Sequence, residues 1–90
     1  MQFMVIEHFK YRNAKAVYDR FREKGRMMPE GLKYVASWTE ANYGRCFEVV
    51  ECDDPVLLKK WASNWSDIED FEFLPVLSSN EMSEKMANQH

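Results

Sequence analysis

QFMVIEHF, residues 2–9, is the stretch of sequence that decides the fold. In an extended chain, successive side chains point to opposite sides, so this stretch presents two faces. One face carries Phe3, Val5, Glu7 and Phe9, and the other carries Met4, Ile6 and His8. Both faces are mostly apolar, which is typical of a strand that is covered on both sides. We therefore predict that residues 2–9 form a central strand of a sheet.

A helix is predicted directly after this strand. Asn13 is suited to cap its N-terminus. Apolar residues then recur from Ala14 to Phe21 at the i, i+3, i+4, i+7 spacing of one helical face. Gly25 provides a C-terminal stop, because glycine readily adopts the left-handed conformation in which helices often end.

The rest of the chain predicts three more strands and one more helix. The strands are expected at residues 32–39, 45–52 and 71–77. Asp53-Asp54-Pro55 is a helix start signal, and the helix that it begins is expected to reach about Trp65. Pro75 has no backbone N–H to donate to a neighbouring strand, which places the last strand at an edge of the sheet.

This order of elements predicts an α+β domain with the ferredoxin-like βαββαβ topology over residues 1–77. Its antiparallel sheet would have strand order 4-1-3-2, with both helices on one face. A central first strand and an edge strand containing Pro75 both agree with that order. For residues 78–90 the pattern leaves open a short helix around residues 81–86 or a disordered tail.

Two helices on one face leave the other face of the sheet uncovered. We expect the uncovered face to be lined by some of Met4, Ile6, Tyr34, Trp38, Cys46 and Val50. Monomeric proteins rarely expose an apolar patch of this kind, and the commonest assembly is a symmetric dimer. The sequence therefore predicts a homodimer that forms through the open sheet face.

Composition excludes several classes of partner. The 90 residues carry a formal net charge of −3, which gives no basic surface for nucleic acid or an anionic membrane. The third predicted strand has one aromatic residue, Phe47, followed by Glu48, which is unlike an RNA-recognition strand. No secretion signal or membrane-spanning run is present, and a cytoplasmic location is expected. Cys46 and Cys52 would lie about 20 Å apart along one strand, too far for a disulfide.

The sequence resembles a small bacterial family known only as a domain of unknown function. The resemblance is carried by FMVIEHF (3–9), EKGRMMPEGLKYVASW (23–38) and CFEVVECDDP (46–55), and it covers roughly residues 1–76. That family is similar to the dimeric α/β barrel superfamily, in which two ferredoxin-like protomers pack sheet to sheet. The superfamily includes the antibiotic-biosynthesis monooxygenases. The resemblance implies a fold and a dimer, and it assigns no activity.

His8 and Glu48 are the candidate catalytic residues, both for proton transfer. A histidine beside a pocket could act as an acid or base near neutral pH, and a buried carboxylate has a raised pKa. Glu7 and Glu51 are further acidic candidates on neighbouring strands. The alternatives are a histidine packed in the core or interface and carboxylates that are solvated or paired with a basic residue such as Arg26.

Tyr34, Trp38 and Cys46 are the candidate pocket residues. Tyr34 and Trp38 are predicted to share a strand face, where they could form walls for a flat apolar ligand. Aromatic residues in strands are also common in ordinary cores, so a purely structural role stays open. Whether Trp38 lies beside Cys46 or Phe47 depends on the hairpin register.

No metal or cofactor site is predicted. His8, His90 and the two cysteines have no metal-ligand spacing, and the three glycines form no phosphate-binding loop. Two functions remain, a non-catalytic module that binds a small apolar ligand in a cavity between the sheets and a cofactor-free enzyme. The enzyme would be monooxygenase-like or isomerase-like and would act on a small aromatic or apolar substrate.

Overall fold

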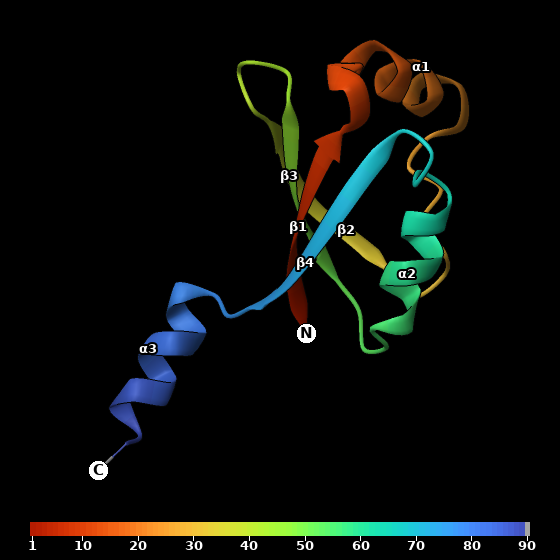
Figure 1. Ribbon diagram of the computed structural model, residues 1–90. Helices are drawn as coiled ribbons and strands as arrows, with labels where there is room; N and C mark the ends of the chain where they lie inside the picture. Colours follow the sequence, from red (N-terminus) through yellow and green to blue (C-terminus); the bar gives the residue numbers. More distant parts are fainter. Residues whose placement is uncertain (90) are drawn as a thin grey trace.

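The computed structural model describes residues 1–89, which form a four-stranded antiparallel sheet with helices on one side (Figure 1). The strands are β1 (Gln2–Phe9), β2 (Lys33–Thr39), β3 (Arg45–Glu51) and β4 (Glu69–Val76). The helices are α1 (Ala14–Lys24), α2 (Val56–Ser63) and α3 (Ser79–Ala87), with a 3-10 turn, η1, at Lys10–Arg12. The strand order β2-β3-β1-β4, read from the other edge, is 4-1-3-2. The predicted ferredoxin-like βαββαβ fold is confirmed.

β1 is a central strand, as its two apolar faces predict. It pairs with β3 on one side and with β4 on the other. Its buried residues alternate with half-buried ones, and Phe3, Val5, Glu7 and Phe9 are the buried set. These four face α1 and α2, which lie on the same side of the sheet in Figure 1. Pro75 lies in β4, which forms an edge of the sheet, also as predicted.

The core fills the space between this face and the two helices. Val5 and Val50 from the sheet, and Leu58 and Trp61 from α2, are among its least exposed side chains. Burying such side chains stabilises a fold by roughly 1.5–3 kcal/mol each relative to leaving them in water. The side chain of Leu32, just before β2, is also buried in this cluster.

The boundaries of α1 and α2 follow the signals in the sequence. The Asn13 side chain accepts a hydrogen bond from the Ala16 backbone at 3.1 Å, and Gly25 ends α1 with φ 69°. Asp54 accepts a hydrogen bond from the Val56 backbone at 3.0 Å. α2 ends at Ser63, short of the predicted Trp65, and a succession of turns leads into β4.

Strand β4 begins two residues earlier than predicted, at Glu69 rather than residue 71. Glu69 therefore belongs to the sheet and pairs with Phe9 at the end of β1. This shift places an acidic side chain on the face that the helices cover.

The prediction that Tyr34 and Trp38 share a face was wrong. The β2–β3 pairing shifts register between Tyr34 and Ala36, so that Tyr34 is opposite Val50 while Trp38 is opposite Phe47. A bulge of this kind reverses the facing of every later residue in the strand. Tyr34 lies toward the helices, and Trp38 lies on the open face.

Cys46 and Val50 were also expected as candidates for the open face, and the pairing of β1 with β3 corrects this. Cys46 is opposite Glu7 and Val50 is opposite Phe3, both of which face the helices. Cross-strand partners share a face. The open face therefore carries the alternate residues, including Met4, Ile6, His8, Phe47, Val49 and Leu74.

Of the short helix and the disordered tail that the sequence left open after residue 77, the structure shows a helix, α3. Ser78 and Glu81 form a reciprocal capping box at its start. All its residues are exposed, and Figure 1 shows it projecting away from the sheet beyond β4. Among residues 1–89, no helix is long and apolar enough to cross a membrane.

Candidate functional site

A cavity of about 110 Å³ lies between the sheet and the helices α1 and α2. Three carboxylic side chains line it, each from a different strand: Glu7 from β1, Glu48 from β3 and Glu69 from β4. They are only 7%, 3% and 1% exposed, in that order. Glutamate is rarely buried to this degree unless it is paired. Three buried glutamates around one small space therefore mark the cavity as a candidate site.

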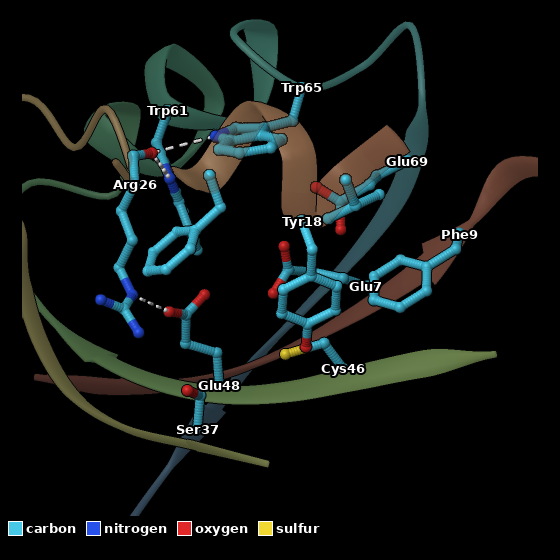
Figure 2. A pocket seen from close by; sticks show the side chains of 12 residues that line it. Glu7, Phe9, Tyr18, Arg26, Ser37, Cys46, Glu48, Trp61, Trp65 and Glu69 are labelled. Atoms are coloured by element: carbon cyan, nitrogen blue, oxygen red, sulfur yellow. Dashed lines mark hydrogen bonds and ion pairs between the residues drawn. The ribbon is translucent and has the colours of Figure 1, made fainter. Parts of the chain in front are cut away.

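Strand pairing explains why these three side chains meet. Glu48 is directly opposite Val5, and Glu69 is directly opposite Phe9. Glu7, Val5 and Phe9 belong to the same face of β1, so the three glutamates all point toward the helices. Figure 2 shows Glu7 lying between Glu48 and Glu69.

Burial shifts the acidity of all three groups in the same direction. Loss of water raises the pKa of Glu7 to about 8, and the charge of Glu69 adds to this effect. Burial likewise raises the pKa of Glu48 to about 8, with a further contribution from the charge of Glu7. Burial also raises the pKa of Glu69, to about 7. The pKa values of all three carboxyl groups therefore lie near neutral pH.

Glu69 is the least satisfied of the three. Neither Oε1 nor Oε2 accepts a hydrogen bond from a donor among residues 1–89. The Glu7 carboxyl is its neighbour, and a proton on Glu7 would give one of these two oxygens a donor. A buried polar atom without a partner is costly, and in native structures it is uncommon.

Arg26 closes one side of the cavity and pairs with Glu48. Its Nε donates to Glu48 Oε1 at 3.0 Å. The guanidinium carbon lies 3.7 Å from the centroid of the Tyr34 ring and 4.9 Å from that of Phe21. These cation–π contacts hold the charged group flat between two rings. Arg26 is thereby fixed at the edge of the cavity.

The backbone of Arg26 is anchored by two tryptophans. The indole Nε1 atoms of Trp61 and Trp65 both donate to the Arg26 carbonyl oxygen, each at 3.0 Å (Figure 2). The next residue, Met27, adopts the left-handed conformation with φ 57°. Non-glycine residues pay a strain energy there, and such strain often accompanies functional sites.

The cavity reaches the surface between α1 and β2. Tyr18 and Phe21 line it and are 39% and 36% exposed, so they form its rim. The Tyr18 hydroxyl makes a hydrogen bond with the Thr39 hydroxyl, which joins α1 to β2 beside this opening. Deeper walls come from Phe9, Val17, Trp61 and Trp65.

The structure brings together only part of the predicted site. Glu48 and Cys46 line the cavity, and Tyr34 contacts Arg26 at its edge. His8 and Trp38 lie on the opposite, open face, where His8 Nε2 is 3.6 Å from Glu72 Oε2 and Trp38 is 59% exposed. His8 and Glu48 are thus separated by the sheet, because they occupy opposite faces.

Three cavity residues were missed or set aside by the sequence reasoning. Glu69 lies outside the strand that the sequence predicts at residues 71–77, and neither Trp61 nor Trp65 is among the residues that the sequence indicates for a site. Continuing the alternation of Phe73 and Phe71 backward by one step would have placed Glu69 on the inner face. No sequence pattern indicates that the two indoles would share one carbonyl oxygen.

Cysteine and metal chemistry are not favoured in this cavity. Burial raises the pKa of the Cys46 thiol far above its usual range, and the charges of Glu7 and Glu48 raise it further. Both cysteines are free, so no disulfide links them.

Within residues 1–89, no group of three or more His, Cys, Asp or Glu side chains is arranged to hold a metal ion. His90, which the sequence reasoning considered, lies outside the described residues.

Comparison with known proteins gives a family without an activity. No curated protein matches the chain, and no solved structure matches it. A family described as "Domain of unknown function (DUF3303)" matches residues 1–90. The match covers the whole sequence, so the chain belongs to this DUF3303 family.

Proposed function

We propose that this protein binds a small molecule in the cavity between the sheet and the helices and transfers protons on it. The observation that carries the proposal is the placement of Glu7, Glu48 and Glu69, all buried, around one cavity. This site differs from the one that the sequence suggested, which lay between the sheets of a dimer. It keeps the isomerase-like alternative, because carboxyl groups that titrate near pH 7 suit acid–base catalysis.

The arrangement supports different roles for two of the carboxyl groups, one as a base and one as an acid. Arg26 pairs with Glu48, and its positive charge favours the ionised form of that carboxyl. The pKa values of Glu48 and Glu7 are both about 8, so the ion pair with Arg26 is the feature that assigns Glu48 as the base that accepts a proton from one atom of the substrate. Glu7, raised to a pKa of about 8, carries the proton that is returned to a second atom. One proton leaves the substrate and one arrives, so the substrate is isomerised without a change in its charge.

The walls of the cavity fit the apolar part of such a substrate. Phe9, Val17, Trp61 and Trp65 supply aromatic and aliphatic surface beside the carboxyl groups. Ligand sites usually combine an apolar lining with a few polar groups that fix orientation. A non-catalytic binding protein would use the same lining, and the two functions differ only in whether protons move.

Proton exchange into deuterated solvent tests this proposal. We expect the protein to speed the exchange of α-protons in small aryl ketones such as phenylacetone, as followed by proton NMR in D2O. Glu48→Gln should reduce the rate at least tenfold, because it removes the base and retains the shape. Glu72→Gln, on the open face, is the matched control and should leave the rate unchanged. Thermal stabilisation by these ketones without any exchange would instead identify a binding module.

We also propose that two copies associate through the open sheet face, as in the dimeric α/β barrel superfamily that the sequence resembles. Trp38 and Leu74 are 59% and 49% exposed on that face, beside half-buried Ile6 and Phe47. A surface this apolar favours association.

We also propose a cytoplasmic location, which the two free cysteines support because thiols stay reduced there.

A further inference from the structure

The charged groups around the cavity indicate the charge of the ligand that it binds. We infer that the substrate is a small organic cation, an amine or ammonium compound with an apolar body, whose positive nitrogen lies beside Glu69. This inference rests on the proposed function, because it names the substrate class of the same cavity. It goes further by assigning the charge of the ligand and the residue that recognises it.

Glu69 provides the first step of the argument. Its side chain lines the cavity, is 1% exposed, and accepts no hydrogen bond from an N–H group or hydroxyl among the described residues. A proton on the Glu7 carboxyl would serve only one of its two oxygens. Native structures seldom leave a buried acceptor without a donor. A ligand with N–H groups would supply the missing donors, and a charged nitrogen would form the stronger type of hydrogen bond.

The second step is the charge of the groups around the cavity. Among the residues that line it, three are acidic and only Arg26 is basic. Arg26 is already paired with Glu48, and no basic side chain among the described residues forms an ion pair with Glu7 or Glu69, although the charge of Arg20 acts on Glu69. The nearby Arg20 is held by Asp67 through two hydrogen bonds of 2.7 Å and by the Asn64 carbonyl. An anionic ligand would be repelled here, whereas a cation would be attracted.

The third step separates an organic cation from a metal ion. No set of three acidic, histidine or cysteine side chains within residues 1–89 is arranged for metal coordination. Aromatic rings of Phe9, Tyr18, Trp61 and Trp65 line the same space. Aromatic walls attract organic ammonium groups through cation–π interactions and also cover an apolar body. A volume of about 110 Å³ limits the ligand to a small molecule.

Three probes with the same ring and different charge test the inference: benzylamine, benzyl alcohol and benzoate. Binding is measured at pH 7 by thermal shift and by changes in the NMR signals of the Trp61 and Trp65 indole N–H groups. We expect benzylamine to raise Tm and to shift both signals, with at least tenfold weaker binding of the alcohol and of benzoate. The indole signals are read in the unmodified protein, so this result does not depend on a variant that folds.

Matched variants then assign the recognition to Glu69. Glu69→Gln should weaken benzylamine binding at least tenfold, and Glu69→Asp, which keeps the charge, should weaken it less. Glu72→Gln on the open face should leave the affinity unchanged. Equal or tighter binding of benzoate or benzyl alcohol would overturn the cation assignment and leave the proposed proton transfer standing. Tight benzylamine binding without any exchange of α-protons, either in phenylacetone or in its cationic counterpart α-aminoacetophenone, would overturn the catalytic proposal and leave the cation assignment standing. Failure of all three probes to bind would overturn the cation assignment.

Discussion

Three glutamates in a small core are the most consequential residues of this protein. Their burial opposes their ionisation, and each ionised neighbour makes the next ionisation harder. The ion pair with Arg26 partly offsets this for Glu48, and the charge of Arg20 partly offsets it for Glu69. A core built only for stability would place apolar side chains at these positions. The three buried glutamates therefore cost stability, and the proposed function would account for that cost.

The pKa shifts predict a fall in stability as the pH rises. An ordinary glutamate has a pKa of 4.5, and the folded protein raises Glu7 and Glu48 to about 8 and Glu69 to about 7. Between pH 4.5 and about pH 8, these glutamates bind more protons in the folded state than in the unfolded state. Raising the pH through this range therefore favours unfolding. We expect the free energy of unfolding to fall from pH 5 to pH 8, as measured by urea denaturation.

Glu69→Gln should flatten this pH dependence. The amide keeps the size of the side chain and removes its titration, which accounts for a loss on the order of 2–3 kcal/mol between pH 5 and pH 8. The variant should therefore be more stable than the unmodified protein at pH 8. Glu72→Gln, on the open face, serves as the control. If the stability of Glu69→Gln falls with pH as steeply as that of the unmodified protein, the raised pKa of Glu69 is contradicted.

At the scale of elements, the connector between α1 and β2 also holds Arg26 beside the cavity. Glycines with positive φ mark its two ends, Gly25 at 69° and Gly31 at 93°. Between them, the Arg26 carbonyl is held by two indoles and the Met27 carbonyl by the Asn64 side chain at 3.0 Å. α2 and the turn after it thereby position the arginine that closes the cavity.

This shared carbonyl predicts that Trp61 and Trp65 are energetically coupled. Trp61→Phe or Trp65→Phe removes one hydrogen bond, at about 1 kcal/mol in addition to lost packing, and leaves the other donor in place. The double variant leaves the carbonyl without either donor. We expect it to lose at least ~0.5 kcal/mol more than the sum of the single variants in urea unfolding. Tyr43→Phe, in the exposed loop between β2 and β3, should change stability little, and strict additivity would contradict the shared bond.

At the scale of the whole molecule, the sheet separates two faces with different side chains. The face toward α1 and α2 holds the cavity and the three carboxyl groups. The other face carries half-buried and exposed apolar residues that no helix covers. Its size and composition are the basis for the proposed homodimer.

The proposed dimer predicts a solution mass of twice 10.8 kDa in light scattering or sedimentation. Trp38→Glu introduces a charge into the open face and should shift the protein toward monomer at micromolar concentration. Val56→Glu is the matched control, because Val56 is equally exposed but lies at the start of α2 on the helix side. A stable monomer of the unmodified protein under these conditions would remove the basis for the dimer.

The sequence by itself determined the topology. The two apolar faces of residues 2–9, the Asn13 and Asp54 caps, Gly25 and the edge proline all act through local backbone preferences that any chain with these residues shares. It also identified Glu48 and Cys46 as site candidates. They lie in the cavity, although it is on the helix side of the sheet rather than the open side.

Only the tertiary structure decided where the site lies. A bulge after Tyr34 reversed the facing of Trp38, and a two-residue extension of β4 brought Glu69 inward. Because side chains alternate along a strand, a shift of one residue moves a side chain from one face to the other. The register of neighbouring strands is a property of the folded sheet. The meeting of Glu7, Glu48 and Glu69, and the two indoles on one carbonyl, therefore follow from packing between segments far apart in the sequence.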